Sequence, residues 1–265
     1  MQKDFAGINT RKALKCGKGL SLALLCWSFA GFSMAQVADG PGIDGKWFSY
    51  PGRVDPLKEL PLAPPPPVPE PPLKAEFIDA WRAERAMLEE ASARGEPIAT
   101  GYTHCLPDGM PTMMQAMFPM EVLESKGQVT IIQEAYSQVR RIYLDESQIL
   151  YDEAEPRFWG HSVGQWEGDT LVVDTVGIKD YVQFMNVPHS NQVRIHERIR
   201  LISPDMMENR ITLTDPEYLT GPWEWIWMYS RNPDYKLFEY VCEDNREFAD
   251  PETGAARMRL FGVDD

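Results

Sequence analysis

Three ionisable side chains lie on strand-like segments and have the chemistry of an acid–base site: His161, Asp174 and Glu197. A histidine and a carboxylate in an apolar pocket can act as proton donor and acceptor, because burial moves their pKa values toward the working pH. The set therefore predicts a lyase, isomerase or hydratase that needs no cofactor and acts on a lipophilic substrate. The same side chains are also compatible with hydrogen bonds that only hold loops in place.

Glu197 stands on the apolar face of its predicted strand. Side chains alternate across a strand, so in residues 193–202 Glu197 shares a face with Ile199 and other aliphatic residues. A buried carboxylate is costly unless it is paired or protonated. Arg141, which shares a face with Tyr143, is the predicted partner. The pair is interpreted either as an internal tie between strands or as the polar floor of a ligand pocket.

Aromatic side chains gather on one face of a later strand. Trp223, Trp225 and Trp227 alternate with Glu224 and Ile226. Flat rings of this kind either fill a small barrel or line an apolar groove. The predicted ligand-binding residues are Arg141, Tyr143, Trp159, Glu197, Trp223, Trp225 and Trp227.

Two other kinds of chemistry are disfavoured by the spacing. Gly160–Gly164 reads G-H-S-V-G, with Ser162 at the nucleophile position, but the nucleophile elbow needs a strand-to-helix turn and another strand follows here. The four histidines match no compact set of metal ligands, since His196 and Glu197 fall on opposite faces. The sequence therefore predicts no metal and no cofactor.

The segment 159–175, WGHSVGQWEGDTLVVDT, predicts a β-hairpin. A Gly-Asp turn separates two runs with the period of strands. Trp159, His161 and Val163 share one face, which we expect to be the inner wall, and Ser162 lies on the other. This hairpin is stronger evidence for a barrel than for a catalyst.

The elements that must position these residues are almost all strands. Short connections with Gly, Asn, Asp, Pro or Ser separate them, as in a meander that closes into a barrel or folds as a sandwich. The expected strands are 47–50, 120–123, 129–134, 139–145, 158–166, 170–176, 193–202, 209–214, 223–229 and 237–242.

Before the main run of strands, the chain contains a proline-rich segment and one helix. Residues 61–72 hold so many prolines that they should lie extended as polyproline II, a stiff strap over the domain surface. Residues 74–94 have the helical spacing of apolar side chains, and Gly95 and Pro97 end the run. We expect this amphipathic helix to pack across the barrel.

The first 35 residues have the features of an export signal: a basic start, an apolar run from 20 to 32 and small residues before a cut after Ala35. Cleavage would leave Cys105 and Cys242, which predict one disulfide in an oxidising compartment, or alternatively two buried thiols. Lys and Arg number 26 against 40 Asp and Glu, a net charge of −14. That balance disfavours nucleic acid and anionic membrane surfaces as partners.

Several blocks of the sequence together resemble a group of exported bacterial proteins. The blocks are CLPDGMP (105–111), RIYLD (141–145), WGHSVGQWEGDTLVVD (159–174), HER (196–198), DP (215–216), PW (222–223) and YVCE (240–243). The resemblance covers nearly all of the chain after the signal and implies an exported β-rich domain, without a particular reaction. Where that group often has Asp-Gly-Arg, this chain has Asp145-Glu146-Ser147, so no role of that arginine is carried over. Gly45-Lys46-Trp47 also looks like the opening of lipocalin-like barrels.

The sequence thus predicts a mainly β protein: an antiparallel up-and-down, lipocalin-like barrel with one N-terminal amphipathic helix and a proline-rich strap. Its expected parts are a signal peptide (1–35), a strand with the strap (36–72) and the helix with the barrel (73–265). We expect a periplasmic or secreted protein that binds a small, largely apolar molecule and does not insert into a membrane after cleavage. The alternatives are the acid–base enzyme and a structural envelope protein with a filled core. The substrate and the oligomeric state do not follow from the sequence.

Overall fold

A computed structural model describes six stretches of the chain: residues 42–52, 62–96, 105–150, 153–242, 247–249 and 256–258. The predicted signal peptide and His104 lie outside the described residues. Within these stretches, no helix is long and apolar enough to cross a membrane.

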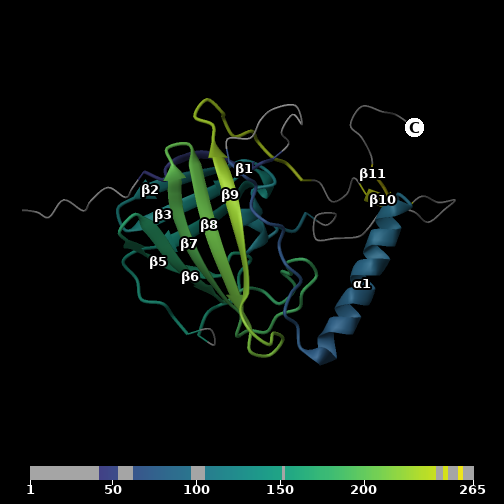
Figure 1. Cartoon of the computed structure of the whole chain (residues 1–265). Helices are drawn as coiled ribbons and strands as arrows, with labels where there is room; N and C mark the ends of the chain where they lie inside the picture. The colour runs from purple at the N-terminus through teal and green to yellow at the C-terminus, as the bar shows by residue number, and fades with distance from the viewer. Residues whose placement is uncertain are drawn as a thin grey trace, which may run out of the picture. The chain divides into compact units, whose positions relative to one another are not determined.

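The strands form a closed barrel, as predicted (Figure 1). Each strand pairs with the next along the chain, and the first also pairs with the ninth, so that the described sheet has no free edge. The strands are β1 (Gly45–Tyr50), β2 (Met120–Ser125), β3 (Gln128–Gln133), β4 (Gln138–Tyr143), β5 (His161–Glu167), β6 (Thr170–Val176), β7 (Arg194–Ser203), β8 (Met206–Thr214) and β9 (Trp223–Arg231).

One strand pair departs from the predicted up-and-down order. β4 and β5 are parallel, with Ile142 opposite Ser162, whereas the other barrel pairs are antiparallel. A parallel pair needs a connection of a dozen or more residues, because the chain must return along the barrel. The stretch 144–160 is long enough for this crossing. The barrel is therefore mixed, and the purely antiparallel prediction was wrong at this point.

The remaining elements are short except for one helix. That helix, α1 (Ala75–Ala93), confirms the prediction to within one residue at each end. The others are the 3-10 turns η2 (Thr112–Gln115) and η3 (Ala135–Ser137) and a two-stranded sheet of β10 (Glu247–Ala249) and β11 (Ala256–Met258).

The predicted strand 237–242 is absent. Those residues have no regular structure, and side-chain contacts hold the segment instead. Glu134 accepts hydrogen bonds from the Tyr235 hydroxyl (2.7 Å) and from the Phe238 backbone N–H (2.8 Å). The barrel already closes through β1 and β9, so this apolar run has no strand edge to join.

A disulfide joins Cys105 to Cys242, as predicted, with 5.6 Å between their Cα atoms. It links the chain before β2 to the segment after β9. Because the two cysteines are 137 residues apart, the bond encloses most of the barrel strands in one covalent loop.

The strap runs over the outside of the barrel. At one end, the Tyr50 hydroxyl contacts the backbone of Leu62, whose N–H donates to it over 3.0 Å. At the other end, the Trp223 indole N–H donates to the Pro69 carbonyl (2.9 Å), and Thr220 donates to the carbonyl of Pro72. These contacts support the expectation of a surface strap.

The side of α1 that carries Trp81 packs against loops of the barrel domain rather than across its strands, as had been expected. Trp81 is buried, and its indole N–H donates to the Met185 carbonyl over 2.9 Å. The Phe77 ring lies 4.6 Å from that of Tyr218. α1 is therefore anchored to two loops, which belong to the β6–β7 and β8–β9 connections.

We expect Trp81→Phe to lower the free energy of unfolding by about 1 kcal/mol, because it leaves the Met185 carbonyl without its donor while keeping most of the apolar contact. Urea unfolding measures the change. Phe77→Leu is the control, since it removes ring contact but no hydrogen bond. Equal stability of Trp81→Phe and the native protein would contradict the assigned role of this bond.

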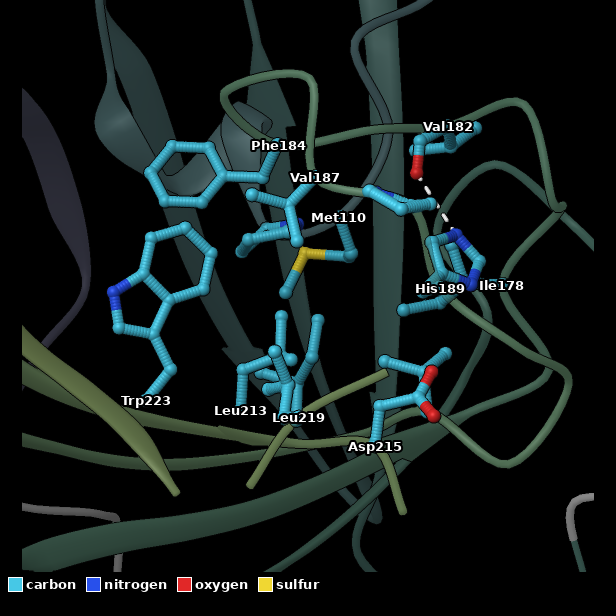
Figure 2. Close-up of a pocket in the computed structure, with 14 residues that line it drawn as sticks. Met110, Ile178, Val182, Phe184, Val187, His189, Leu213, Asp215, Leu219 and Trp223 are labelled. Carbon is cyan, nitrogen blue, oxygen red and sulfur yellow. Dashed lines mark hydrogen bonds between the residues drawn. The ribbon is translucent and has the colours of Figure 1, made fainter. Parts of the chain in front are cut away.

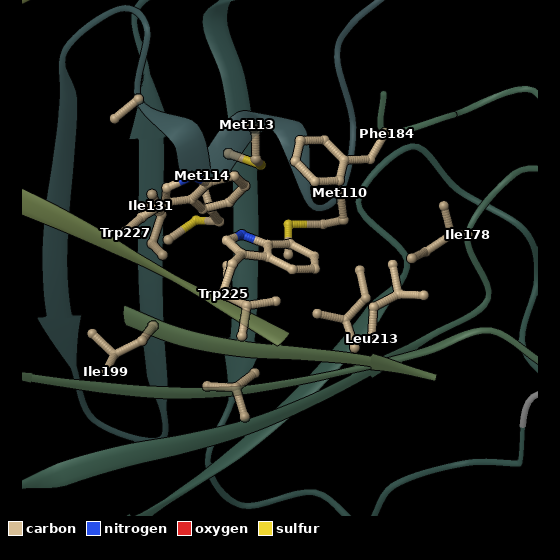
Figure 3. Packing of buried hydrophobic residues seen from close by; sticks show 14 of the residues in the cluster. Met110, Met113, Met114, Ile131, Ile178, Phe184, Ile199, Leu213, Trp225 and Trp227 are labelled. Carbon is tan, nitrogen blue, oxygen red and sulfur yellow. The ribbon is translucent and has the colours of Figure 1, made fainter. Parts of the chain in front are cut away.

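Side chains fill the inside of the barrel. Methionines from the chain before β2 meet aromatic side chains of β9 and aliphatic ones of β3, β7 and β8 (Figure 3). Labelled there are Met110, Met113, Met114, Ile131, Ile178, Phe184, Ile199, Leu213, Trp225 and Trp227. Small barrels are commonly filled in this way.

Candidate functional site

A belt of polar side chains crosses the barrel interior, with one residue from each of six consecutive strands. They are Arg140 (β4), Ser162 (β5), Thr175 (β6), Glu197 (β7), Asn209 (β8) and Tyr229 (β9), and none is more than 1% exposed. The expectation that Glu197 faces the interior is confirmed.

Arg140 and Glu197 form the centre of this belt. Their side chains meet through two contacts, one between Nη1 and Oε1 at 3.2 Å and one between Nη2 and Oε2. Arg140 also donates to Ser162 (3.2 Å) and Thr175 (3.0 Å), and the Asn209 amide donates to Glu197 (2.9 Å). Both charges are therefore paired and hydrogen-bonded, which is what burial of ions requires.

Tyr229 closes the belt on the β9 side. Its hydroxyl donates to the carbonyl of Met114 over 2.5 Å, and burial raises the pKa of its phenol far above the ordinary value. The phenol thus stays protonated and acts as a fixed hydrogen-bond donor. Because the whole belt is enclosed by protein, it serves as an internal tie between strands.

The predicted partner of Glu197 was wrong by one residue. Arg141 is exposed on the outer face, and its neighbour Arg140 points inward. Arg141 was predicted to point inward because it shares its face of the strand with the apolar side chains of Val139 and Tyr143. The inner face of β4 is instead partly polar, because it carries Arg140.

The inner and outer faces of β5 are also reversed relative to the prediction. Ser162 points inward, whereas His161 lies on the outer face, where its ring stacks on Tyr143 at 5.6 Å. Its Nε2 is 3.7 Å from the carboxylate of Glu146, which is longer than a hydrogen bond. Trp159 lies before the strand and donates to the side chain of Gln138 (3.2 Å). These residues do not form an inner wall.

The three predicted acid–base residues are not brought together. Glu197 lies inside the barrel, while His161 and Asp174 are on the outer face. The sheet therefore separates the Glu197 carboxylate from the His161 ring. Asp174 instead contacts Nδ1 of His196 at 3.2 Å. Among the described residues, no three His, Cys, Asp or Glu side chains form a group that could hold a metal ion.

The tryptophans of β9 are buried around a residue that the sequence analysis missed, Phe184. Its ring centroid lies 5.3 Å from Trp223, 5.0 Å from Trp225 and 5.6 Å from Trp227. Phe184 belongs to the β6–β7 connection, and Figure 2 shows its ring beside that of Trp223. The barrel thus receives an aromatic ring from a loop.

Phe184 stands at the base of a two-residue turn, which we call the Phe184 hairpin (184–187). Phe184 pairs with Val187, and both residues at the tip have a positive φ, Met185 at 54° and Asn186 at 60°. Asparagine tolerates this conformation, whereas methionine rarely adopts it. The Asn-containing turn signal in F-M-N-V was present in the sequence, but no pattern indicated that the ring would enter the barrel.

Beside Phe184 lies a tight apolar recess of about 10 Å³, enough for one water molecule (Figure 2). Met110, Val182, Leu213 and Trp223 contribute to its lining. At its polar side, His189 contacts the carbonyl oxygen of Val182 through Nε2 at 2.9 Å.

A larger groove of about 600 Å³ lies between α1 and the loops at this end of the barrel. Leu88 of α1, Phe158 and the half-exposed Tyr181 contribute apolar surface to it. Val182 and Phe184 line both the groove and the recess. The Phe184 hairpin therefore separates an open groove from the tryptophans in the barrel.

No protein-family model matches the chain, and no curated protein matches it.

Proposed function

We propose that this protein binds a small, largely apolar molecule with a flat ring at the end of the barrel where Phe184 packs. The observation that carries the proposal is the position of Phe184, a loop residue inserted among three tryptophans with a groove on its outer side. Phe184 occupies the place that a ligand ring would take. Aromatic rings packed at these separations attract one another beyond simple area burial.

The dimensions and lining of the groove support this proposal. Its volume of about 600 Å³ lies within the range of small-molecule sites. Apolar surface comes from Leu88, Phe158 and Tyr181, and Thr112 and Gln115 supply neutral polar groups that would orient a ligand. Four charged side chains also line the groove: Glu84, Arg85, Glu89 and Asp108. A ligand would first lie in the groove and then displace Phe184 from the tryptophans.

Displacement of Phe184 requires the hairpin to move as a unit. Only its tip is tied to α1, through the Trp81 bond to Met185 and the contact of Asn186 with Glu84 at 3.3 Å. The apparent affinity equals the affinity of the open form multiplied by the fraction of molecules in which the hairpin is open. Weak binding in the native protein and tighter binding after the tip is loosened are therefore expected together.

Export of the protein is part of the same proposal. A disulfide persists in oxidising compartments, and the N-terminal sequence has the order of an export signal. We place the protein in the periplasm or outside the cell, in keeping with the exported bacterial group that its sequence blocks resemble.

The filled interior favours a second candidate, a structural protein of the cell envelope. Buried side chains occupy the barrel, and the recess beside Phe184 holds about 10 Å³. This candidate predicts that small apolar molecules do not bind in the groove. One titration therefore separates the two.

We expect the neutral dye Nile red to gain fluorescence with the native protein and to bind Leu88→Asp roughly tenfold more weakly, because the substitution removes an apolar contact and adds a further carboxylate to a groove that Glu84, Glu89 and Asp108 already line. Met87→Asp is the matched control: Met87 is the next residue of α1 and is 60% exposed, and it does not line the groove. Fluorescence titration measures all three affinities. Absence of binding to the native protein, or an equal loss in both variants, would refute the proposal and favour the structural candidate.

A further inference from the structure

The strap covers a second groove on the outside of the barrel, away from the Phe184 hairpin. This groove, of about 490 Å³, is lined by Pro66, Pro67 and Pro69 of the strap and by side chains of β7, β8 and β9. The strap is held on either side of it, at Leu62 by Tyr50 and at Pro69 by Trp223. The groove therefore has an apolar proline wall that both attachments keep in place.

Two arginines face each other in this groove. Arg198 of β7 and Arg210 of β8 are directly opposite in the strand register, and both line the groove. Like charges at such positions repel each other and lower stability. An anion between them would relieve this repulsion, and the planar guanidinium groups suit carboxylate or phosphate oxygens.

The carboxylates of this face leave donors of both arginines available. Arg198 donates to Glu167 through Nη1 at 2.9 Å, and Arg210 donates to Glu208 through Nε and Nη2 at 2.8 and 3.3 Å. A guanidinium has five N–H donors, so each arginine keeps further donors after these bonds. The side chains of Arg198 and Arg210 are 43% and 54% exposed, which lets a ligand reach them.

A second row of side chains crosses the same groove next to the arginines. His196 of β7 is opposite Thr212 of β8, which is opposite Glu224 of β9. Because Asp174 contacts Nδ1 of His196, only the other ring nitrogen remains for a ligand. Glu224 accepts a hydrogen bond from Thr212 (3.1 Å) and adds negative charge at the β9 edge.

We propose that the groove under the strap binds a small organic anion whose single carboxylate or phosphate group lies between Arg198 and Arg210. The apolar body of this ligand lies between Ile226 and the strap prolines, which line the same groove. Glu224 disfavours a second negative charge at the β9 edge. Within the lining of this groove, the two arginines stand against a single carboxylate, that of Glu224.

The test uses benzoate and phenyl phosphate as probes and neutral benzamide as the comparison, in calorimetric titrations of the full chain. We expect both anions to bind, benzamide not to bind, and Arg198→Gln/Arg210→Gln to weaken both anions by at least about tenfold. Arg157→Gln is the matched control, because it removes another exposed arginine that is paired with a carboxylate, Glu155, away from this groove. The difference between the two anions tells whether a carboxylate or a phosphate is preferred.

Arg198→Lys/Arg210→Lys keeps both positive charges and is the control for a general loss of structure in the double glutamine variant. We expect it to bind benzoate with intermediate affinity, since lysine lacks the planar fork. The His196 ring proton signals, assigned with His196→Gln, should shift when benzoate binds the native protein. Binding of benzoate that is unchanged in the double glutamine variant, absent from the native protein or equalled by benzamide would overturn the proposal.

Discussion

Glu197→Ala is expected to lower the free energy of unfolding by about 3–5 kcal/mol. The substitution leaves the Arg140 guanidinium inside the barrel without its counter-ion, and breaking one side of a buried ion pair typically costs this much. The amide of Asn209 loses its acceptor as well. Urea unfolding followed by tryptophan fluorescence measures the loss.

The chain provides a matched comparison for the same pair. Arg140→Ala should destabilise the protein as strongly as Glu197→Ala, whereas Arg141→Ala, at the adjacent exposed position, should stay within about 0.5 kcal/mol of the native protein. Arg140→Met/Glu197→Leu should recover much of the loss, because it removes both charges. If Arg141→Ala were the more damaging of the two arginine variants, the inward orientation of Arg140 would be wrong.

Loss of the disulfide is the second large effect. Cys105→Ser/Cys242→Ser is expected to lower the free energy of unfolding by up to about 5 kcal/mol, because the bond closes a loop of 137 residues in the unfolded chain. It also removes one of the attachments of the segment after β9, which keeps its hydrogen bonds to Glu134. Thermal unfolding with and without a reductant measures the change.

A control separates the covalent bond from the cysteine side chains. Reductant should lower the melting temperature of the native protein and leave that of the double serine variant unchanged. Equal melting temperatures of the oxidised native protein and the double serine variant would show that the bond contributes nothing to stability.

Most of the fold could be predicted because its signals are local. Alternation and turn residues marked β1 to β9, and helical spacing with Gly95 and Pro97 marked α1. The disulfide followed from the cysteine count and the predicted export signal. The parallel pairing of β4 and β5 was missed, because strand direction depends on where the chain returns along the barrel rather than on any pattern inside a strand.

The candidate site could be predicted only in part. The alternation of side chains along its strand correctly predicted that Glu197 lies inside the barrel, because that strand has one clearly apolar face. In β4 both faces mix apolar and polar residues, so the same argument chose Arg141 over Arg140. Phe184 carried no signal of its own role, since a phenylalanine in a loop can pack in many places.

The sequence by itself determined the kind of protein: a β-barrel with the helix α1, a strap and a disulfide, because these depend on periodicity, turn chemistry and composition. Only the tertiary structure decided which side chains meet. Arg140 pairs with Glu197 across 57 residues of sequence, and Phe184 enters a cluster formed by β9. The physical reason is that, in the closed barrel, each strand turns inward the face whose charged groups find partners and whose side chains fill the barrel interior. That choice depends on all the strands together, and no single segment contains it.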